Sequence, residues 1–410
     1  MIKIAMVVFS HYPTDPRVRR EAEALVEAGM SVDVISLIRH DGEATRASVN
    51  GVAVHRIPLR QKRAGKLQYF IQYGYFIVAA FLKLSRLHLS RLYDIVHIHN
   101  MPDILVSTAL LPKMTGSKII LDLHDPMPEL YMTKYAMDAS HPVVKVLRTL
   151  EKLSILFADR VITPNIAFRD LFVSRSCPPW KIHIVMNSPQ EHIFHTRDII
   201  PVDDSSSHKR DKFHLMYHGL IVERHGLDDA IAAVSELRDK IPNLKLHIYG
   251  DGEFLGDLKE KVYRSGVGDW VKFYGFVTLE QIAAAISQID LGIIPNKMGP
   301  FTNLNFPTRI FEYLSMEKPV VVPKTRGICD YFPEDSIYFF EAGDVNSLAK
   351  VISKAYKNPR EYNLMVKRGM DIYHQHRWGL EKQRLINLVL NLLGTHQTPF
   401  GKELNNEASL

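Results

Sequence analysis

The chain has 410 residues, of which 46% are hydrophobic and 23% are charged. This length predicts two or three domains, and the composition is typical of a folded, soluble protein rather than a disordered or fibrous one. The two cysteines, Cys177 and Cys329, belong to no CxxC or Cys/His cluster. Their isolation argues against a disulfide framework and a structural zinc site. Because the first residues also lack the features of a signal peptide, we expect a cytoplasmic protein.

The formal net charge of +6 is concentrated in one part of the sequence. Residues 1–200 contain 25 Lys and Arg against 18 Asp and Glu, whereas the remainder is nearly balanced. The segment from Arg56 to Arg91 contains eight basic residues and no acidic one. The excess charge is therefore local, and with no RNA-binding motif present a nucleic-acid partner is not expected.

Apolar, β-rich runs alternate with helical patterns along the first half of the chain. We expect strands at residues 2–9, 31–37, 52–57, 95–98, 118–123, 160–163 and 182–186, and helices at residues 17–29, 67–92, 102–114 and 143–157. Residues 201–212, PVDDSSSHKRDK, are rich in serine and charge, as is typical of a solvated linker. We place a domain boundary there.

The alternation resumes with strands expected at residues 213–217, 245–249, 271–274, 291–294 and 319–322 and helices at residues 227–240 and 307–316. This pattern predicts an α/β protein with two doubly wound, Rossmann-like domains, at residues 1–200 and 213–377, facing a central cleft between the carboxyl ends of their strands. A last helix at residues 378–395 is expected to return to the N-terminal domain. The polar tail at residues 396–410 is expected to be disordered.

Two strand-to-helix turns could meet a ligand. Residues 218–226, HGLIVERHG, follow a predicted strand, and there glycines allow close backbone approach while Arg224 can pair with a diphosphate. An ordinary turn explains the same glycines equally well, so the spacing leaves both interpretations open. The next turn, GDGE at residues 250–253, carries two carboxylates that would repel phosphate, and an ordinary tight turn explains it better.

The segment NFPTRIFEYLSMEKPVVV at residues 305–322 predicts a helix followed by a strand. Pro307 suits a first helical turn, and Ile310, Phe311 and Leu314 form one apolar face. Glu312 lies off that face, where it is either a solvated helix residue or a carboxylate for ligand hydroxyls. Composition alone favours the solvated residue.

Seven segments carry a resemblance to a known family. The segments in the second half are YHGLIVERHGLDDAI, LHIYGDGE, VKFYGFV and PTRIFEYLSMEKPVVV, and those in the first half are DPRVRREAEAL, YDIVHIHN and LDLHDP. Together they resemble glycosyltransferase family 4 over about residues 1–395. The resemblance implies a GT-B fold and a hexosyltransferase that moves a sugar, with retention of anomeric configuration, from a nucleotide sugar to an acceptor hydroxyl. It implies a UDP- or GDP-linked donor, no metal or other cofactor, and a place in bacterial-type surface polysaccharide or lipid-linked glycan synthesis.

The resemblance also assigns donor-binding residues. The cation that binds the donor diphosphate in this family corresponds to Arg224, followed by His225 where lysine is common. Leu220 stands where many members have a second arginine, and Arg309 can supply that charge. The glutamate that holds the ribose corresponds to Glu312. The complete implied donor set is Gly219, Arg224, His225, Gly250, Phe276, Thr308, Arg309 and Glu312.

On the acceptor side, His124 matches the histidine that the family places near the reacting sugar, with a strand-end histidine bonded to its neighbours as the plain alternative. The implied catalytic residues are His124, Arg224 and Glu312, and the implied acceptor residues are Asp15, His99, Asn100 and His124. We expect His97 and His99 to point to opposite faces of their strand, with His97 buried, so no metal pair is predicted there.

Transfer with retention in this family is described as a front-face substitution, in which the leaving diphosphate helps to take the acceptor proton. The protein then mainly orients the donor and neutralises phosphate charge. Two other functions stay open: a GT-B sugar-nucleotide epimerase, which needs paired acid/base carboxylates, and a catalytically silent partner of another transferase. Leu304 occupies the position of the family's other glutamate, which lends weight to the silent partner.

The basic segment at residues 56–91 encloses residues 67–82, which carry no charge and are rich in Tyr and Phe. Basic flanks around aromatic residues suit peripheral attachment to an anionic membrane, such as the inner face of the plasma membrane. A buried helix with solvated ends is the equally favoured alternative. The partners expected from the sequence are thus a nucleotide sugar, a glycan or lipid-linked acceptor, and an anionic membrane surface.

Overall fold

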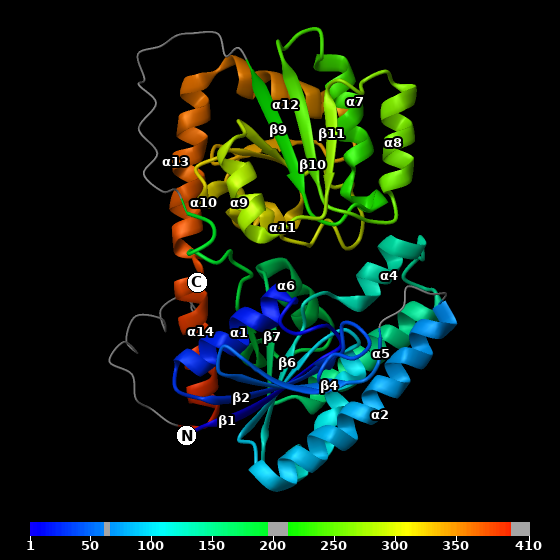
Figure 1. Ribbon diagram of the computed structural model, residues 1–410, viewed down its shortest axis with the longest axis vertical. Coiled ribbons are helices and arrows are strands. Elements are labelled where there is room, and N and C mark those ends of the chain that lie inside the picture. The colour runs from blue at the N-terminus through cyan, green and yellow to red at the C-terminus, as the bar shows by residue number, and fades with distance from the viewer. Residues whose placement is uncertain (61–65, 196–211, 395–410) are drawn as a thin grey trace. The chain divides into compact units, whose positions relative to one another are not determined.

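The structure is a computed structural model that describes residues 1–60, 66–195 and 212–394. It contains two mainly parallel sheets packed with helices (Figure 1). The linker predicted at residues 201–212 lies outside the described residues except for Lys212, and the tail predicted at residues 396–410 lies wholly outside them.

The first sheet has eight strands in the order β3-β4-β2-β1-β5-β6-β7-β8. β1 pairs in parallel with β2 and β5, β2 with β4, and β5 with β6, whereas β3 is antiparallel to β4. β3 was not predicted, because its polar–apolar alternation extends over only four residues and none of them is buried. The strands are β1 (Lys3–Val8), β2 (Ser31–Leu37), β3 (Arg46–Val49), β4 (Val52–Ile57), β5 (Ile95–His99), β6 (Lys118–Asp122), β7 (Arg160–Thr163) and β8 (Ile182–Ile184).

Most of the helices between these strands begin where the sequence provides a capping residue or a proline. Asp15 caps the first of them, since its carboxylate accepts the backbone N–H groups of Arg17 and Val18. The helix expected at residues 102–114 is instead a 3-10 helix followed by a short α-helix. The elements are α1 (Pro16–Glu27), α2 (Lys66–Arg91), η1 (Asp103–Ala109), α3 (Leu110–Met114), α4 (Met127–Tyr135), α5 (Pro142–Phe157), α6 (Ile166–Arg175) and η2 (Pro179–Lys181).

The second sheet has six parallel strands in the order β11-β10-β9-β12-β13-β14. The chain leaves β9 toward β10 on one side and returns to β12 on the other, and such a reversal is where open α/β sheets bind ligands, at the carboxyl ends of the strands. The strands are β9 (Phe213–His218), β10 (Leu244–Tyr249), β11 (Val271–Gly275), β12 (Leu291–Ile293), β13 (Val320–Pro323) and β14 (Tyr338–Phe340). The helices are η3 (Glu223–His225), α7 (Leu227–Leu237), α8 (Leu255–Arg264), α9 (Leu279–Ser287), α10 (Arg309–Ser315), α11 (Arg326–Cys329), α12 (Val345–Lys357), α13 (Pro359–Gln375) and α14 (Trp378–Leu392).

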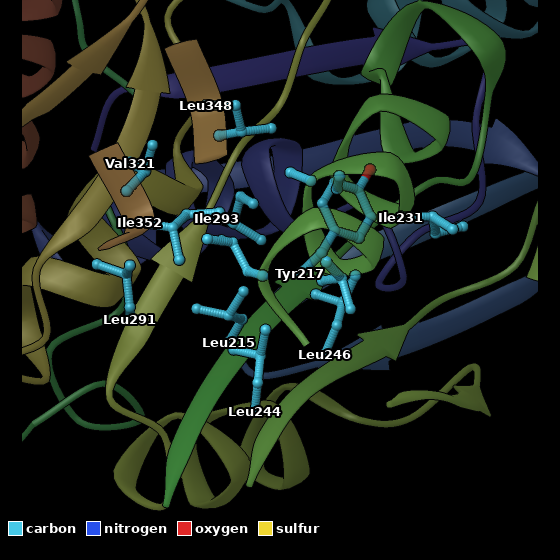
Figure 2. Packing of buried hydrophobic residues seen from close by; sticks show 14 of the residues in the cluster. Leu215, Tyr217, Ile231, Leu244, Leu246, Leu291, Ile293, Val321, Leu348 and Ile352 are labelled. Atoms are coloured by element: carbon cyan, nitrogen blue, oxygen red, sulfur yellow. The ribbon is translucent and has the colours of Figure 1, made fainter. Parts of the chain in front are cut away.

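Alternate residues of β9 fill two apolar clusters, because successive side chains of a strand point to opposite faces of the sheet. Leu215 and Tyr217 pack with Ile231 of α7 and Ile352 of α12 in one cluster (Figure 2). Met216 belongs to the other cluster, which α9, α10 and α13 cover. Apolar side chains therefore cover both faces of β9.

The described residues form two compact units: those within residues 1–122, 154–161 and 382–394, and those within residues 123–153 and 162–381. Within the first unit, Lys382 of α14 forms an ion pair with Glu27 at the end of α1. No helix among the described residues combines the length and the hydropathy that crossing a bilayer requires.

Candidate active site

Two glycine turns follow neighbouring strands at the carboxyl edge of the second sheet. Gly219 follows β9 with φ +126°, and Gly250 follows β10 with φ +135°. The Gly219 N–H donates to the carbonyl of Tyr249 at 2.9 Å. A Cβ on Gly250 would lie 1.9 Å from the Gly219 carbonyl oxygen, so a side chain there would push the two turns apart. The turns therefore expose backbone groups at this edge with no side chain over them.

Arg309, at the first position of α10, lies against the first of these turns. Its Nη1 donates to the backbone carbonyl of His218 at 2.7 Å, and its guanidinium lies 4.6 Å from the ring centroid of Tyr217. These two contacts fix the plane of the guanidinium beside Gly219. The structure thus places a cation next to the turn in which Leu220 occupies the position of the second arginine.

His225 is held by a short polar network. Its Nδ1 lies 2.7 Å from the carbonyl oxygen of Leu220 and 2.9 Å from the hydroxyl of Tyr217, and that hydroxyl donates to the same carbonyl at 2.6 Å. Burial, reinforced by the positive charge of Arg309, lowers the pKa of His225 to about 3. The ring is therefore neutral at neutral pH, and it does not supply the charge of the lysine that is common at this position.

Arg224 belongs to η3, directly after the first turn. Its side chain is half-buried, and its Nε is fully enclosed without a hydrogen-bond partner among the described residues. Burial lowers the pKa of this guanidinium from its ordinary value, although arginine stays protonated near neutral pH. Because Nε has no exposed surface in this conformation, a ligand oxygen can reach only the exposed part of this half-buried side chain.

Glu312 does not have the solvated side chain that composition alone favours. The side chain is 14% exposed, and its Oε2 lies 3.2 Å from Nε2 of His218. Burial, with a further contribution from Arg309, lowers the pKa of His218 well below its ordinary value. Glu312 is therefore a carboxylate beside a neutral imidazole, at the edge that also carries Arg309.

The remaining residues of the implied donor set lie in less enclosed positions. Thr308 is half-buried at the start of α10, and its carbonyl accepts the N–H groups of Phe311 and Glu312. Phe276 follows β11 at the same edge of the sheet and is 85% exposed. The side chain of Asn303, next to Leu304, already takes part in a hydrogen bond within the fold, because its Oδ1 accepts the backbone N–H of Arg326 at 3.1 Å.

The expectation that His97 and His99 point to opposite faces of β5 is wrong. Residues i and i+2 share one face of a strand, and the two rings stack with centroids 4.3 Å apart. His97 is buried as expected, but His99 is buried as well, with 0% exposure. The acceptor role given to His99 stays a prediction.

The other implied acceptor residues follow β1, β5 and β6. Both carboxylate oxygens of Asp15 are occupied, one by the cap of α1 and the other by the hydroxyl of Ser10 at 2.8 Å. Asn100 is 5% exposed, and its Nδ2 donates to Asp103 at 2.8 Å. His124, two residues after β6, is half-buried. The acceptor roles of Asp15, Asn100 and His124 and the catalytic role of His124 stay predictions.

Sequence reasoning missed several residues that organise these sites. Tyr217 and His218 are the last two residues of β9. The hydroxyl of Tyr217 contacts His225, and its ring contacts the guanidinium of Arg309. The imidazole of His218 lies 3.2 Å from the carboxylate of Glu312. A polar residue at the end of a predicted apolar strand is the signal that could have identified both of them.

Comparisons with known proteins identify the family. A model described as glycosyl transferases group 1 matches residues 200–371, and a model of a glycosyl transferase 4-like domain matches residues 14–188. The chain belongs to the family 4-type glycosyltransferases. It is therefore a glycosyltransferase enzyme of the hexosyltransferase type.

The relatives are distant in sequence and close in fold. An uncharacterized glycosyltransferase of Methanocaldococcus jannaschii is 24% identical over 94% of this chain and 97% of its own length. The sulfoquinovosyl transferase of Arabidopsis thaliana is 24% identical over 62% of this chain and 48% of its own length.

Two solved structures show the fold. Sucrose-phosphate synthase from Thermosynechococcus elongatus matches 97% of this glycosyltransferase and 100% of its own chain, with a TM-score of 0.79 and 17% identity. HepE from Anabaena, in complex with UDP-glucose, matches 95% of this chain and 100% of its own, with a TM-score of 0.70 and 16% identity. Together with the two parallel sheets, these neighbours confirm the predicted GT-B fold.

Proposed function

We propose that this glycosyltransferase moves a hexose from a UDP- or GDP-linked donor to an acceptor hydroxyl with retention of anomeric configuration. The observation that carries the proposal is the carboxyl edge of the second sheet, where two glycine turns, Arg224, Arg309 and the enclosed carboxylate of Glu312 come together. The solved complex of HepE with UDP-glucose supports a nucleotide sugar, with UDP as the first candidate nucleotide.

The chemistry follows from the charges at this edge. A donor diphosphate gains negative charge as its bond to the sugar breaks, and cations already held in place stabilise that charge without reorganisation. Because His225 is neutral, this role falls on Arg224 and Arg309. Glu312 accepts hydrogen bonds from the ribose hydroxyls, and its neutral neighbour His218 does not compete as a cation for the phosphates.

The acceptor is activated without a nucleophilic side chain in this proposal. The leaving diphosphate takes the acceptor proton on the same face of the sugar, so the protein contributes position more than acid–base chemistry. His124, after β6, orients the sugar or the acceptor. The product keeps the anomeric configuration of the donor, which proton NMR of the isolated product measures directly.

Thermal-shift titration with UDP, GDP and ADP tests donor binding. We expect the nucleotide of the true donor to raise the melting temperature, since a ligand that binds only the folded state stabilises it by mass action. Incubation of the matching nucleotide sugars without acceptor then separates a transferase from an epimerase, because only an epimerase converts the sugar. If none of the three nucleotides shifts the melting temperature, the proposed donor site is wrong.

We further propose that α2 attaches the enzyme to an anionic membrane surface, where a lipid-linked or glycan acceptor is presented. Its buried face carries Phe76, Ala80 and Leu84, each with 0% exposure. The opposite face presents large apolar side chains to solvent, each more than half exposed: Ile71, Tyr75, Val78, Leu82 and Leu89. We call these five residues the apolar stripe of α2.

The spacing and charge of this helix suit an interface. At about 100° per residue, the five positions of the apolar stripe lie within about 60° of one another around the helix axis. Arg86 is exposed beside the stripe. An apolar stripe with basic residues next to it lies in the plane of anionic headgroups.

Vesicle flotation tests this attachment. We expect the enzyme to float with phosphatidylglycerol-containing vesicles at low salt and to stay unbound with pure phosphatidylcholine. The double variant Ile71→Glu/Leu82→Glu should lose flotation. Tyr263→Glu is the matched control, since Tyr263 of α8 is 86% exposed and lies outside the stripe. Equal flotation of the double variant and the control, or no binding of the wild type to anionic vesicles, would refute the attachment.

A further inference from the structure

Four buried side chains from three elements of the first unit converge on one point. Glu21 lies on α1, His97 and His99 on β5, and Asp122 at the end of β6. Their exposed fractions are 2% for Glu21 and 0% for the other three. One potential ligand atom of each residue lies within 4.8 Å of those of the other three.

The distances between these atoms match those between ligands of one metal ion. Nε2 of His97 lies 3.7 Å from both Oε2 of Glu21 and Oδ2 of Asp122. Nδ1 of His99 lies 3.3 Å from the same Asp122 oxygen and 4.0 Å from the same Glu21 oxygen. Ligands held tetrahedrally at about 2.0 to 2.1 Å from an ion are about 3.3 to 3.4 Å apart. The four printed nitrogen–oxygen distances exceed that spacing by at most about 0.7 Å, and every pair of potential ligand atoms lies within 4.8 Å.

Hydrogen bonding does not explain the position of His97. A protonated imidazole paired with a carboxylate brings its nitrogen to about 2.7 to 2.9 Å of one oxygen. Nε2 of His97 is instead equidistant from two carboxylate oxygens, at a distance too long for a hydrogen bond. Neither of its ring nitrogens has a hydrogen-bond partner among the described residues, although the ring is completely buried. A buried imidazole in this position lacks the partner that a metal ion would provide.

Arg17 turns the carboxylates toward the histidines. Its Nη2 lies 2.5 Å from Oδ1 of Asp122 and its Nε 3.2 Å from Oε1 of Glu21. The other oxygen of each carboxylate is the one that faces His97 and His99.

We propose that Glu21, His97, His99 and Asp122 bind one divalent transition-metal ion, with Zn²⁺ as the first candidate. Two imidazoles and two carboxylates are ligands that Zn²⁺ accepts, and four protein ligands in a closed pocket are typical of a structural rather than a catalytic ion. The ion ties α1 to the ends of β5 and β6. Asn100 directly follows β5 and His124 lies two residues after β6, so the ion stabilises the backbone that leads to them.

Metal analysis of the full-length, untagged enzyme tests this site. Protein purified from zinc-supplemented cells is examined by inductively coupled plasma mass spectrometry, and the wild type should carry about one Zn²⁺ per chain. His97→Gln should reduce this content by about tenfold or more. His88→Gln is the matched control, because His88 is also buried in the first unit, where it bonds Thr115 at 2.7 Å. The control should keep its metal.

Two further measurements make the result decisive. Refolding with a strong chelator should lower the melting temperature of the wild type, and added Zn²⁺ should restore it, whereas His97→Gln should respond to neither. If His97→Gln does not fold, His99→Gln and the metal content of the wild type take its place. A folded wild type with less than about a tenth of an ion per chain and no response to Zn²⁺ would overturn the proposal, and the cluster would then be an ion-pair network that holds a proton.

Discussion

Replacement of Arg309 by alanine separates a donor-binding role from a structural one. In the free enzyme, the side chain contributes one charged hydrogen bond, 2.7 Å from the carbonyl of His218, and one contact with the ring of Tyr217. Loss of both should cost about 2 kcal/mol of folding stability, which is a fall of a few degrees in melting temperature. A charged hydrogen bond to the diphosphate, strengthened in the transition state, is worth about 3 kcal/mol more, so kcat/KM should fall about 150-fold.

Arg238→Ala is the matched control for this variant. Arg238 also lies over an aromatic ring, 5.5 Å from the centroid of Trp270, and also donates to backbone carbonyls, but it follows α7 at the opposite end from η3. Both variants should lose similar stability in thermal unfolding. Only Arg309→Ala should lose nucleotide affinity in isothermal titration and activity in a sugar-transfer assay. Equal nucleotide affinity and kcat/KM in the two variants would refute the assignment of Arg309 to the donor diphosphate.

Three further variants test the same edge. Gly250→Ala should lower the free energy of unfolding by several kcal/mol, measured by urea denaturation, because its Cβ would lie 1.9 Å from the carbonyl oxygen of Gly219; an unchanged midpoint would contradict the close approach of the turns. Glu312→Ala should reduce the rate of sugar transfer about 100-fold, while its circular dichroism spectrum should stay the same as that of the wild type. Wild-type kinetics in this variant would refute the role of Glu312 in the donor site. The folded-state pKa of His225, about 3, lies below its unfolded value of about 6.5, so the unfolded state binds more protons and stability should fall as the pH decreases from about 6.5 toward 3. His225→Gln should flatten that part of the stability profile, and an identical slope in both proteins would show that the ring is not held neutral.

Local sequence patterns predicted every strand of the two sheets except β3 and β14. The strands predicted at residues 31–37, 52–57 and 160–163 have the same bounds in the structure, because β-branched residues recur in each of these largely buried segments. β3 was missed because an exposed edge strand carries no such pattern. The faces of His97 and His99 could have been predicted correctly, since a period of two places residues i and i+2 on one side of a strand.

The sequence by itself determined the order of the elements, the glycine turns after β9 and β10, and the family through its ordered motifs. Only the tertiary structure decided which charges meet. Arg309 reaches the carbonyl of His218 across 91 residues, and Arg17 reaches Asp122 across 105 residues. Burial also decided the state of two histidines: it keeps His225 neutral and leaves His97 without a hydrogen-bond partner among the described residues. Charge state and ligand geometry depend on what surrounds a side chain in space, and that environment comes from parts of the chain that are distant in the sequence.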